Sequence, residues 1–402
     1  MPAYSNGREG GLRIHTVEVQ IFSRALNKNK ILMAKVVNLG SVMEGIFAIS
    51  IGLILCESDL PSRKLSISEI NNIRRQINFD RGSFKKRIFK GRQKIKDYAV
   101  DNVEVNLTVN LKMGEVGGAF GKQYFENTKE SVISRLISSV VQNAARYRVL
   151  LTEAKNEYLL NERPETVVID VIADGVTGEQ SGGDIKGDVM VNININGKPA
   201  LSNKNLNFSL KAGTTPSKTL SNESPHKSLL RVSQTFNLGI NPDDYAFLEE
   251  SARSPEQKYQ KVVYTKKLYD AVLSGMNQKF SSSGRTGSNL AWQLLKNSAF
   301  GSDYAQVVSI SPREIKESSL EYINALQSAY PDLEVKKTGE KIQFYIMELN
   351  KPLFYLRFKN RSKIIGPESA EIKEMKLMIE TDKIFYQPKD FNPRSPFNKV
   401  GR

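Results

Sequence analysis

The sequence of 402 residues has very few of the side chains that build disulfides and zinc sites. It contains one cysteine, Cys56, and two histidines, His15 and His226. One cysteine cannot form an internal disulfide, and these three side chains cannot form a zinc cluster. We therefore expect a cytoplasmic protein whose chemistry does not depend on several histidine ligands or on a histidine relay.

Long apolar runs are also missing. The longest, Gly45–Cys56, is shorter than the roughly 20 residues that a membrane-spanning helix needs. The first ten residues are polar and glycine-rich, unlike a secretory signal. We expect a buried core helix over residues 39–56 and no membrane partner.

Negative charge is in short supply. Lysine and arginine total 58 against 43 aspartates and glutamates, which gives a formal net charge of +15. Such a surplus indicates a polyanionic partner, nucleic acid first and an acidic membrane surface second. A solvated basic surface without a partner is the alternative.

The glycine-rich segment 281–288 lacks the GxxxxGK[ST] pattern, which argues against a phosphate-loop ATPase.

Hydrophobic periodicity predicts an α/β or α+β fold with a mixed central sheet flanked by helices. Apolar residues alternate strictly over 103–113, a pattern typical of an amphipathic strand, and 166–173 is typical of a core strand. Helices are expected over 39–56, from the SISE capping box at 66–69 onward, and over 128–160. Turns or breaks are expected at 114–121, 214–228 and 281–288.

These patterns predict two domains. Residues 1–240 would form the core, with a basic insertion around 81–125. Residues 241–402 would form a more helical region with a hairpin around Asn350-Lys351, a possible DNA-recognition domain.

Two basic stretches are candidates for contact with a phosphate backbone. The first lies in 81–98, where a solvated helix face is the alternative, and the second follows the expected hairpin, where a core hairpin with a charged rim is the alternative. The candidates in the first stretch are Lys85, Lys86, Arg87, Lys90, Arg92 and Lys94. Those in the second are Arg357, Lys359, Arg361 and Lys363.

The stretch LNFSLKAG, residues 206–213, places polar side chains at the end of an otherwise apolar strand. Ser209 and Lys211 share one face because side chains two apart point the same way. A preceding strand starts at Asp188, after a loop that contains Asp184. If the two strands are antiparallel neighbours, Asp188 lies beside Lys211.

The arrangement GDV…FSLK resembles the core of the PD-(D/E)XK nucleases, which share the restriction-endonuclease-like fold. The resemblance covers residues 1–240. It implies that Asp188 corresponds to the first acid, Lys211 to the lysine and Glu44 to an acid supplied by a helix. Ser209 stands where the family has an acid, so Glu44 or Asp184 must supply the second carboxylate.

The resemblance implies Mg²⁺-dependent cleavage of duplex DNA, with Mn²⁺ as a substitute metal and a homodimer as a possible assembly. Asp188, Glu44 and Asp184 are the candidate metal ligands, since Mg²⁺ prefers oxygen ligands. The metal would activate a water, and Lys211 would stabilise charge on the phosphate. Ser209 could hold a metal-bound water.

Each of these residues also has a purely structural interpretation. A lysine that ends a strand protects a sheet edge, and an aspartate beside glycine is common in turns. Glu44 in the first turns of a helix complements the helix dipole. If these interpretations hold, the chain is a non-enzymatic DNA-binding or phage structural protein.

Overall fold

The computed structural model describes most of the chain from residue 39 onward. All described elements belong to one unit, Leu39–Arg402. The described residues are 39–56, 65–79, 85–95, 103–114, 118–145, 166–173, 187–195, 198–199, 206–212, 219–223, 225–239, 254–282, 284–302, 304–310, 315–338, 341–388 and 391.

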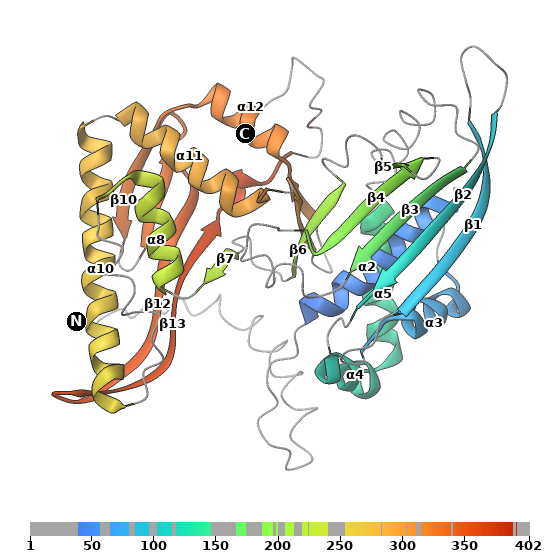
Figure 1. The fold of residues 1–402 in the computed structure, drawn as a ribbon, viewed down its shortest axis with the longest axis horizontal. Helices are drawn as coiled ribbons and strands as arrows, with labels where there is room; N and C mark the ends of the chain where they lie inside the picture. Colours follow the sequence, from blue (N-terminus) through green and yellow to red (C-terminus); the bar gives the residue numbers. More distant parts are fainter. Residues whose placement is uncertain are drawn as a thin grey trace, which may run out of the picture. The chain divides into compact units, whose positions relative to one another are not determined.

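The structure is α+β, with helices and two β-sheets, and its first sheet has eight strands of mixed direction (Figure 1). Strand β2 is antiparallel to β1 and parallel to β3, while β6 lies between antiparallel β4 and parallel β8. The strands are β1 (Lys85–Ile95), β2 (Val103–Met113), β3 (Thr166–Ala173), β4 (Val189–Ile195), β5 (Lys198–Pro199), β6 (Asn207–Ala212), β8 (Gln306–Ile310) and β9 (Ile315–Ser318).

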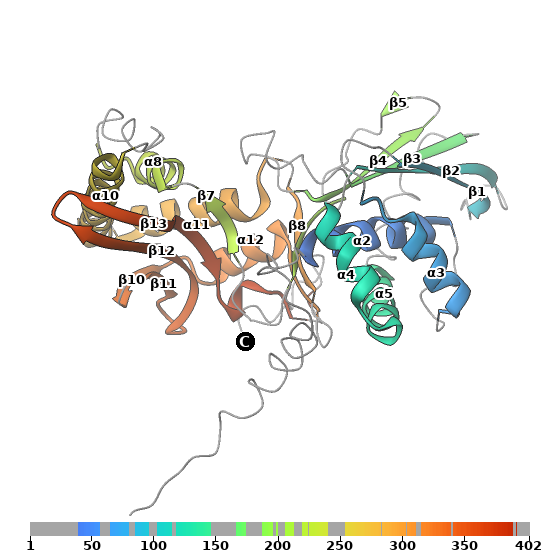
Figure 2. The ribbon, with the colours of Figure 1, turned by 90° about the horizontal axis from the view of Figure 1, so that it is seen from below.

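Helices lie on one side of β1–β4 (Figure 2). The helix α2 carries a single charged residue, Glu44, and its apolar side chains are buried between the sheet and α5. The helix α3 begins with the expected capping box, in which Ser66 and Glu69 each accept from the other's backbone N–H. The four helices are α2 (Leu39–Cys56), α3 (Ile67–Gln76), α4 (Gly118–Asn127) and α5 (Glu130–Ala144).

The second sheet has five antiparallel strands in the order β10-β11-β12-β13-β7. Helices α8, α10 and α11 contact this sheet, and α12 packs on α11. The strands are β7 (Thr219–Glu223), β10 (Leu333–Thr338), β11 (Lys341–Ile346), β12 (Lys351–Gly366) and β13 (Ser369–Thr381). The helices are α8 (Pro225–Phe236), α10 (Pro255–Ser282), α11 (Gly284–Phe300), α12 (Leu320–Ala329) and the 3-10 turn η3 (Lys383–Phe385).

The buried apolar side chains form two clusters that meet at β8. Val308 belongs to the cluster beneath the first sheet, whereas its neighbour Val307 belongs to the cluster of the second sheet. Successive side chains of a strand point to opposite faces, so β8 contributes to both cores. Both valines are fully buried.

Several local expectations are confirmed. The strands predicted over 103–113 and 166–173 are β2 and β3, and the strands expected to start at Asp188 and to run through 206–211 are the antiparallel pair β4 and β6. The hairpin around Asn350-Lys351 is formed by β11 and β12. Asn350 has a φ of 48°, a left-handed conformation that asparagine adopts more readily than most residues.

Other expectations are wrong. The helix-face alternative for 81–98 fails because Lys85–Ile95 is the strand β1, whose residues pair with β2 along its whole length. The turn expected at 114–121 contains the start of α4 at Gly118. The break expected at 281–288, by contrast, is present, because α10 ends at Ser282 and α11 begins at Gly284.

Three regions contain more β-strand than the sequence predicted: the basic insertion around 81–125, the break at 214–228 and the C-terminal region 241–402. The segment 81–125 contributes β1 and β2 to the sheet of the candidate site, and 214–228 contains β7 and the start of α8. Residues 241–402 contain β8–β13 beside the expected helices. Of the helix expected over 128–160, Glu130–Ala144 is helical and residues 146–165 lie outside the described part.

None of the helices that the structure describes has the length and apolar character needed to cross a membrane.

Candidate functional site

Asp188 extends the pairing of β4 with β6 through both its backbone and its side chain. Its backbone N–H donates to the carbonyl of Phe208 at 2.8 Å, and its Oδ2 accepts from the backbone N–H of Leu210 at 2.6 Å. The register aligns Val189 with Phe208, so Asp188 stands at the first position before the ladder. These two bonds fix the carboxylate at the strand end.

Lys211 and Ser209 reach the same carboxylate. The ammonium of Lys211 lies 4.0 Å from Oδ2 of Asp188, and the hydroxyl of Ser209 donates to that oxygen over 3.5 Å. Side chains of Asp188 and Lys211 are 30% and 24% exposed, so solvent retains access to the pair. The structure thus brings together the three residues that the antiparallel argument grouped.

Glu44 approaches this group from α2, more than 140 residues away in the sequence. Its side chain is partly buried among the apolar residues of the helix. Burial and, to a lesser extent, the negative charge of Asp188 raise the pKa of Glu44 from 4.5 to about 8, while the charge of Lys211 acts in the opposite direction. The carboxyl of Glu44 is therefore mostly protonated at pH 7.

The carboxyl groups of Asp188 and Glu44, which interact electrostatically, are oxygen donors of the kind that suits a hard cation such as Mg²⁺. Mg²⁺ commonly binds through one or two carboxylates and completes its shell with waters or phosphate oxygens. A cation would also relieve the unfavourable interaction between Glu44 and Asp188. Over the described ranges, no group of three or more His, Cys, Asp or Glu side chains could share a metal. Asp184 lies outside those ranges.

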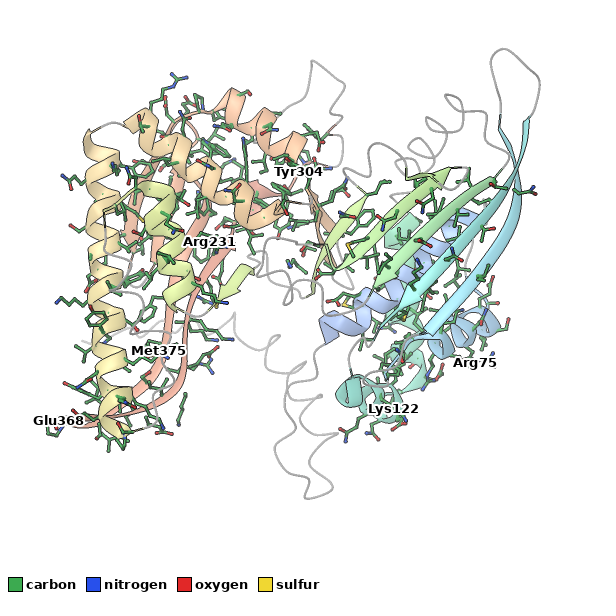
Figure 3. All side chains as sticks on the ribbon, viewed as in Figure 1. Arg75, Lys122, Arg231, Tyr304, Glu368 and Met375 are labelled. Atoms are coloured by element: carbon green, nitrogen blue, oxygen red, sulfur yellow. The ribbon has the colours of Figure 1, made fainter. Side chains whose placement is uncertain are left out.

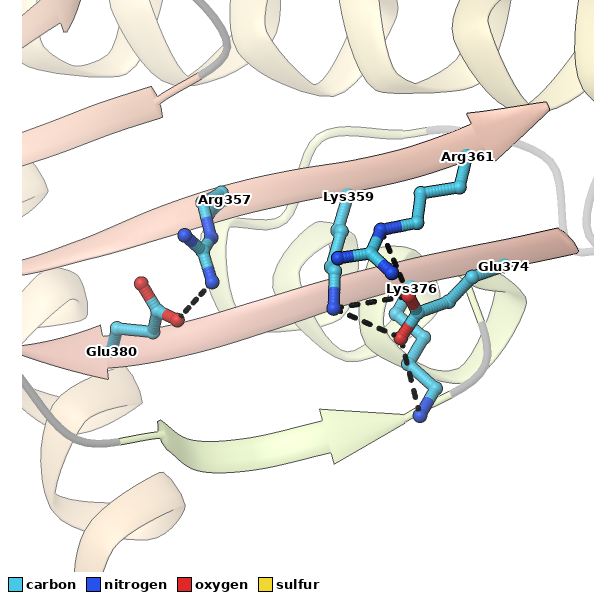
Figure 4. A network of polar contacts seen from close by, with 6 residues as sticks. All are labelled: Arg357, Lys359, Arg361, Glu374, Lys376 and Glu380. Atoms are coloured by element: carbon cyan, nitrogen blue, oxygen red, sulfur yellow. Dashed lines mark hydrogen bonds and ion pairs between the residues drawn. The ribbon is translucent and has the colours of Figure 1, made fainter. Parts of the chain in front are cut away.

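The two sets of basic candidates differ in what the structure describes. The cations of the first set lie on β1, and their side chains are outside the described part. In the second set, Arg357 pairs with Glu380 at 2.6 Å and Lys359 pairs with Glu374 at 3.0 Å on the neighbouring strand β13 (Figure 4).

The sequence patterns did not predict the partners of these cations. The hairpin expected around Asn350-Lys351 pairs β12 only with β11, although β12 continues to Gly366 and also pairs with β13. The dipeptide Gly366-Pro367, followed by alternating apolar and charged residues over 370–373 and 374–377, was the available signal for this second hairpin. The backbone donor of Leu210 at Asp188 left no such signal.

No protein-family model, curated protein or solved structure matches this chain.

Proposed function

We propose that the chain is a metal-dependent DNA endonuclease with a restriction-endonuclease-like core. The observation that carries this proposal is the convergence of Asp188, Ser209 and Lys211 at the ends of two paired strands, with Glu44 close enough for Asp188 and Lys211 to affect its pKa. The resemblance to PD-(D/E)XK nucleases assigns Asp188 as the first acid, Lys211 as the lysine and Glu44 as the acid from a helix. The net charge of +15 supports a polyanionic substrate.

Each residue has a distinct part in this proposal. The bond from Leu210 N–H holds the Asp188 carboxylate in place, so Asp188 can act as a preorganised ligand. Lys211 supplies a positive charge for the phosphate on which negative charge develops. The hydroxyl of Ser209 is a hydrogen-bond donor and acceptor that orients a water beside Asp188.

Asp188 and Glu44 would hold Mg²⁺, or Mn²⁺ in its place. When bound, the ion would supply a nucleophilic water at neutral pH and stabilise charge on the phosphate. Glu44 must give up its proton to become a ligand, and the positive charge of the ion would lower its raised pKa. Asp184 remains a candidate for a further carboxylate.

One observation favours a second candidate, a non-enzymatic DNA-binding or phage structural protein. The described residues offer only two carboxyl groups at this place, and a serine stands where the family has an acid. In that case the pair of Asp188 and Lys211 ties β4 to β6 and has no catalytic part.

The two functions are separated by cleavage of supercoiled plasmid DNA in Mg²⁺ and in EDTA. We expect nicked and linear products in Mg²⁺ alone. Asp188→Asn and Lys211→Ala should each lower the cleavage rate by about two orders of magnitude, the scale for removing a charge-stabilising group. Binding to DNA should change little, because phosphate contacts elsewhere dominate affinity.

A matched control lies on the same sheet. Lys112 pairs with Asp170 at 2.7 Å, and these side chains are also partly exposed. Asp170→Asn removes an ion pair of the same type away from the candidate site, so it should cleave at the parental rate. Equal activity of Asp188→Asn and Asp170→Asn, or cleavage that persists in EDTA, contradicts the proposal.

A further inference from the structure

One face of the second sheet places positive charges directly opposite one another. Lys341 on β11 pairs in register with Arg357 on β12, and Lys359 on β12 pairs in register with Lys376 on β13. Directly opposed residues point to the same face, and like charges at such positions destabilise a sheet. Two such pairs on one face indicate that these cations serve a purpose other than stabilising the fold.

Three of the cations on this face converge on one carboxylate (Figure 4). Atoms of Glu374 lie 3.0 Å from Nζ of Lys359, 3.6 Å from Nε of Arg361 and 3.7 Å from Nζ of Lys376. A hydrogen bond from Lys359 lowers the pKa of Glu374, and the charges of all three cations add to this shift, while desolvation acts in the opposite direction. One negative charge thus balances only part of the positive charge.

These cations are accessible. The side chains of Lys359, Arg361 and Lys376 are 30%, 67% and 39% exposed. The opposite face carries buried residues such as Leu356 and Phe358, and α8 and α10 lie on that side of β12 and β13 (Figure 2). The charged face therefore points away from these helices.

The charged face continues across the sheet with aromatic support. The ammonium of Lys341 lies 4.6 Å from the ring centroid of Tyr355, and that of Lys336 lies 4.4 Å from the ring centroid of Tyr345. These cation–π contacts hold both lysines over the strands. The strands β12 and β13 then run on to a turn at Glu368, labelled in Figure 3.

We propose that Lys359, Arg361 and Lys376 bind a phosphate group of the DNA backbone, and that Glu374 is a built-in counter-ion that holds them together and weakens this contact. The proposal rests on the DNA partner of the proposed function. It extends the earlier candidates by adding Lys376 as a ligand and Glu374 as the residue that limits affinity.

A linear polyanion suits this arrangement. Arg357, Lys359 and Arg361 alternate along one strand, which spaces them about 7 Å apart on one face. A row of cations can contact successive phosphates of a DNA strand, and such contacts position a protein without reading sequence. An acidic membrane surface is the alternative polyanionic partner, and binding to anionic lipid vesicles distinguishes it from DNA in the test below.

The test measures the affinity of the full chain for a labelled mixed-sequence DNA duplex in EDTA, over about 50–200 mM salt. The double variant Lys359→Gln/Lys376→Gln should bind about tenfold more weakly at the lowest salt. The slope of log affinity against log salt should become shallower by roughly 1 to 2. Glu374→Gln should bind about threefold to tenfold more tightly, because a nearby negative charge has gone.

The control is Lys337→Gln. Lys337 is exposed on the same sheet, but it pairs in register with buried Ile342 and so belongs to the opposite face. Its loss should change DNA affinity by less than about twofold. The proposal is overturned if the double variant matches Lys337→Gln, if Glu374→Gln binds no more tightly than the parent, or if the double variant loses binding only to anionic lipid vesicles.

Two measurements keep the inference separate from the proposed function. Thermal unfolding verifies that each variant is folded, and the double variant should be folded because it removes a like-charge pair. The affinities are measured in EDTA and do not depend on cleavage, so a protein without nuclease activity can still show the expected changes in affinity. Conversely, if the parent protein cleaves DNA but the double variant binds DNA as well as Lys337→Gln does, the proposed function stands and this inference is wrong.

Discussion

The two sheets hold glutamates in opposite electrostatic surroundings. Glu44 lies in the apolar helix beneath the first sheet, where burial and Asp188 raise its pKa to about 8. Glu374 lies on an open face of the second sheet, where three cations lower its pKa. A buried carboxyl with a raised pKa must lose its proton before it can bind a cation, whereas an ionised carboxylate among excess cations suits a site that an anion can enter.

The largest expected effects concern the two apolar clusters. Phe47 packs edge-on against Phe208 beneath the first sheet, and Phe344 stacks on Phe354 within the second. All four are fully buried. Phe47→Ala and Phe344→Ala should each lower the free energy of unfolding by about 3–5 kcal/mol, measured by denaturant titration.

The double variant tests whether the clusters are independent. The two costs should add to within about 0.5 kcal/mol, because the substituted rings belong to different clusters. A larger deviation means that the contact through β8 couples the cores. Exposed Ile67 is the control, and Ile67→Ala should change stability by less than about 0.5 kcal/mol.

The next effect sharpens the role of Glu44. Glu44→Gln keeps the shape of the side chain and removes the acid, so cleavage should fall by about two orders of magnitude, equivalent to about 2.7 kcal/mol. Plasmid cleavage in Mg²⁺ measures it. If Glu44→Gln cleaves DNA at the parental rate and Asp184→Asn does not cleave, Asp184 supplies the second carboxylate. Glu44 then has only a structural role.

Glu44 should also give the fold a pH dependence. Because its folded pKa is raised above 4.5, its stabilising contribution is complete below pH 4.5 and is lost as pH rises toward about 8. We expect a loss of about 2 kcal/mol, less than the full shift implies because the side chain is only partly buried. Chemical unfolding of Glu44→Gln in the absence of metal should lack this loss, and an unchanged pH profile contradicts the assignment.

The smallest effect concerns Glu374. Its pKa is lowered, so its contribution to stability is present above about pH 4.5 and is lost as pH falls through the folded pKa. Glu374→Gln should lower the melting temperature slightly at neutral pH and low salt. The difference should disappear near 1 M salt, where exposed charges are screened. A difference that persists at high salt indicates a packing role.

Local patterns predicted much of the site. Alternation over 206–211 and the start of a strand at 188 placed Asp188, Ser209 and Lys211 together, because side-chain direction in a strand repeats every two residues. An antiparallel pair joined by a short connection leaves few alternatives for the register. The same period predicted β2 and β3.

The rest depended on contacts between distant segments. The helix α2 is apolar on nearly every side, so its sequence has no periodicity that shows where Glu44 points. The strand β13 was missed, and with it the partner that brings Glu374 to Lys359. The glycine-rich segment 114–121 signalled a turn, although a helix begins within it at Gly118.

The sequence by itself determined the positive charge of the chain, the strands with one apolar face and the pairing of Asp188 with Lys211. These properties follow from composition and from a repeat of two residues, which act over short distances along the chain. Only the tertiary structure decided that the charge of Asp188 acts on Glu44 and that three cations share Glu374. Those approaches join residues far apart in sequence or on different strands, and burial and Coulomb interaction depend on distance in space.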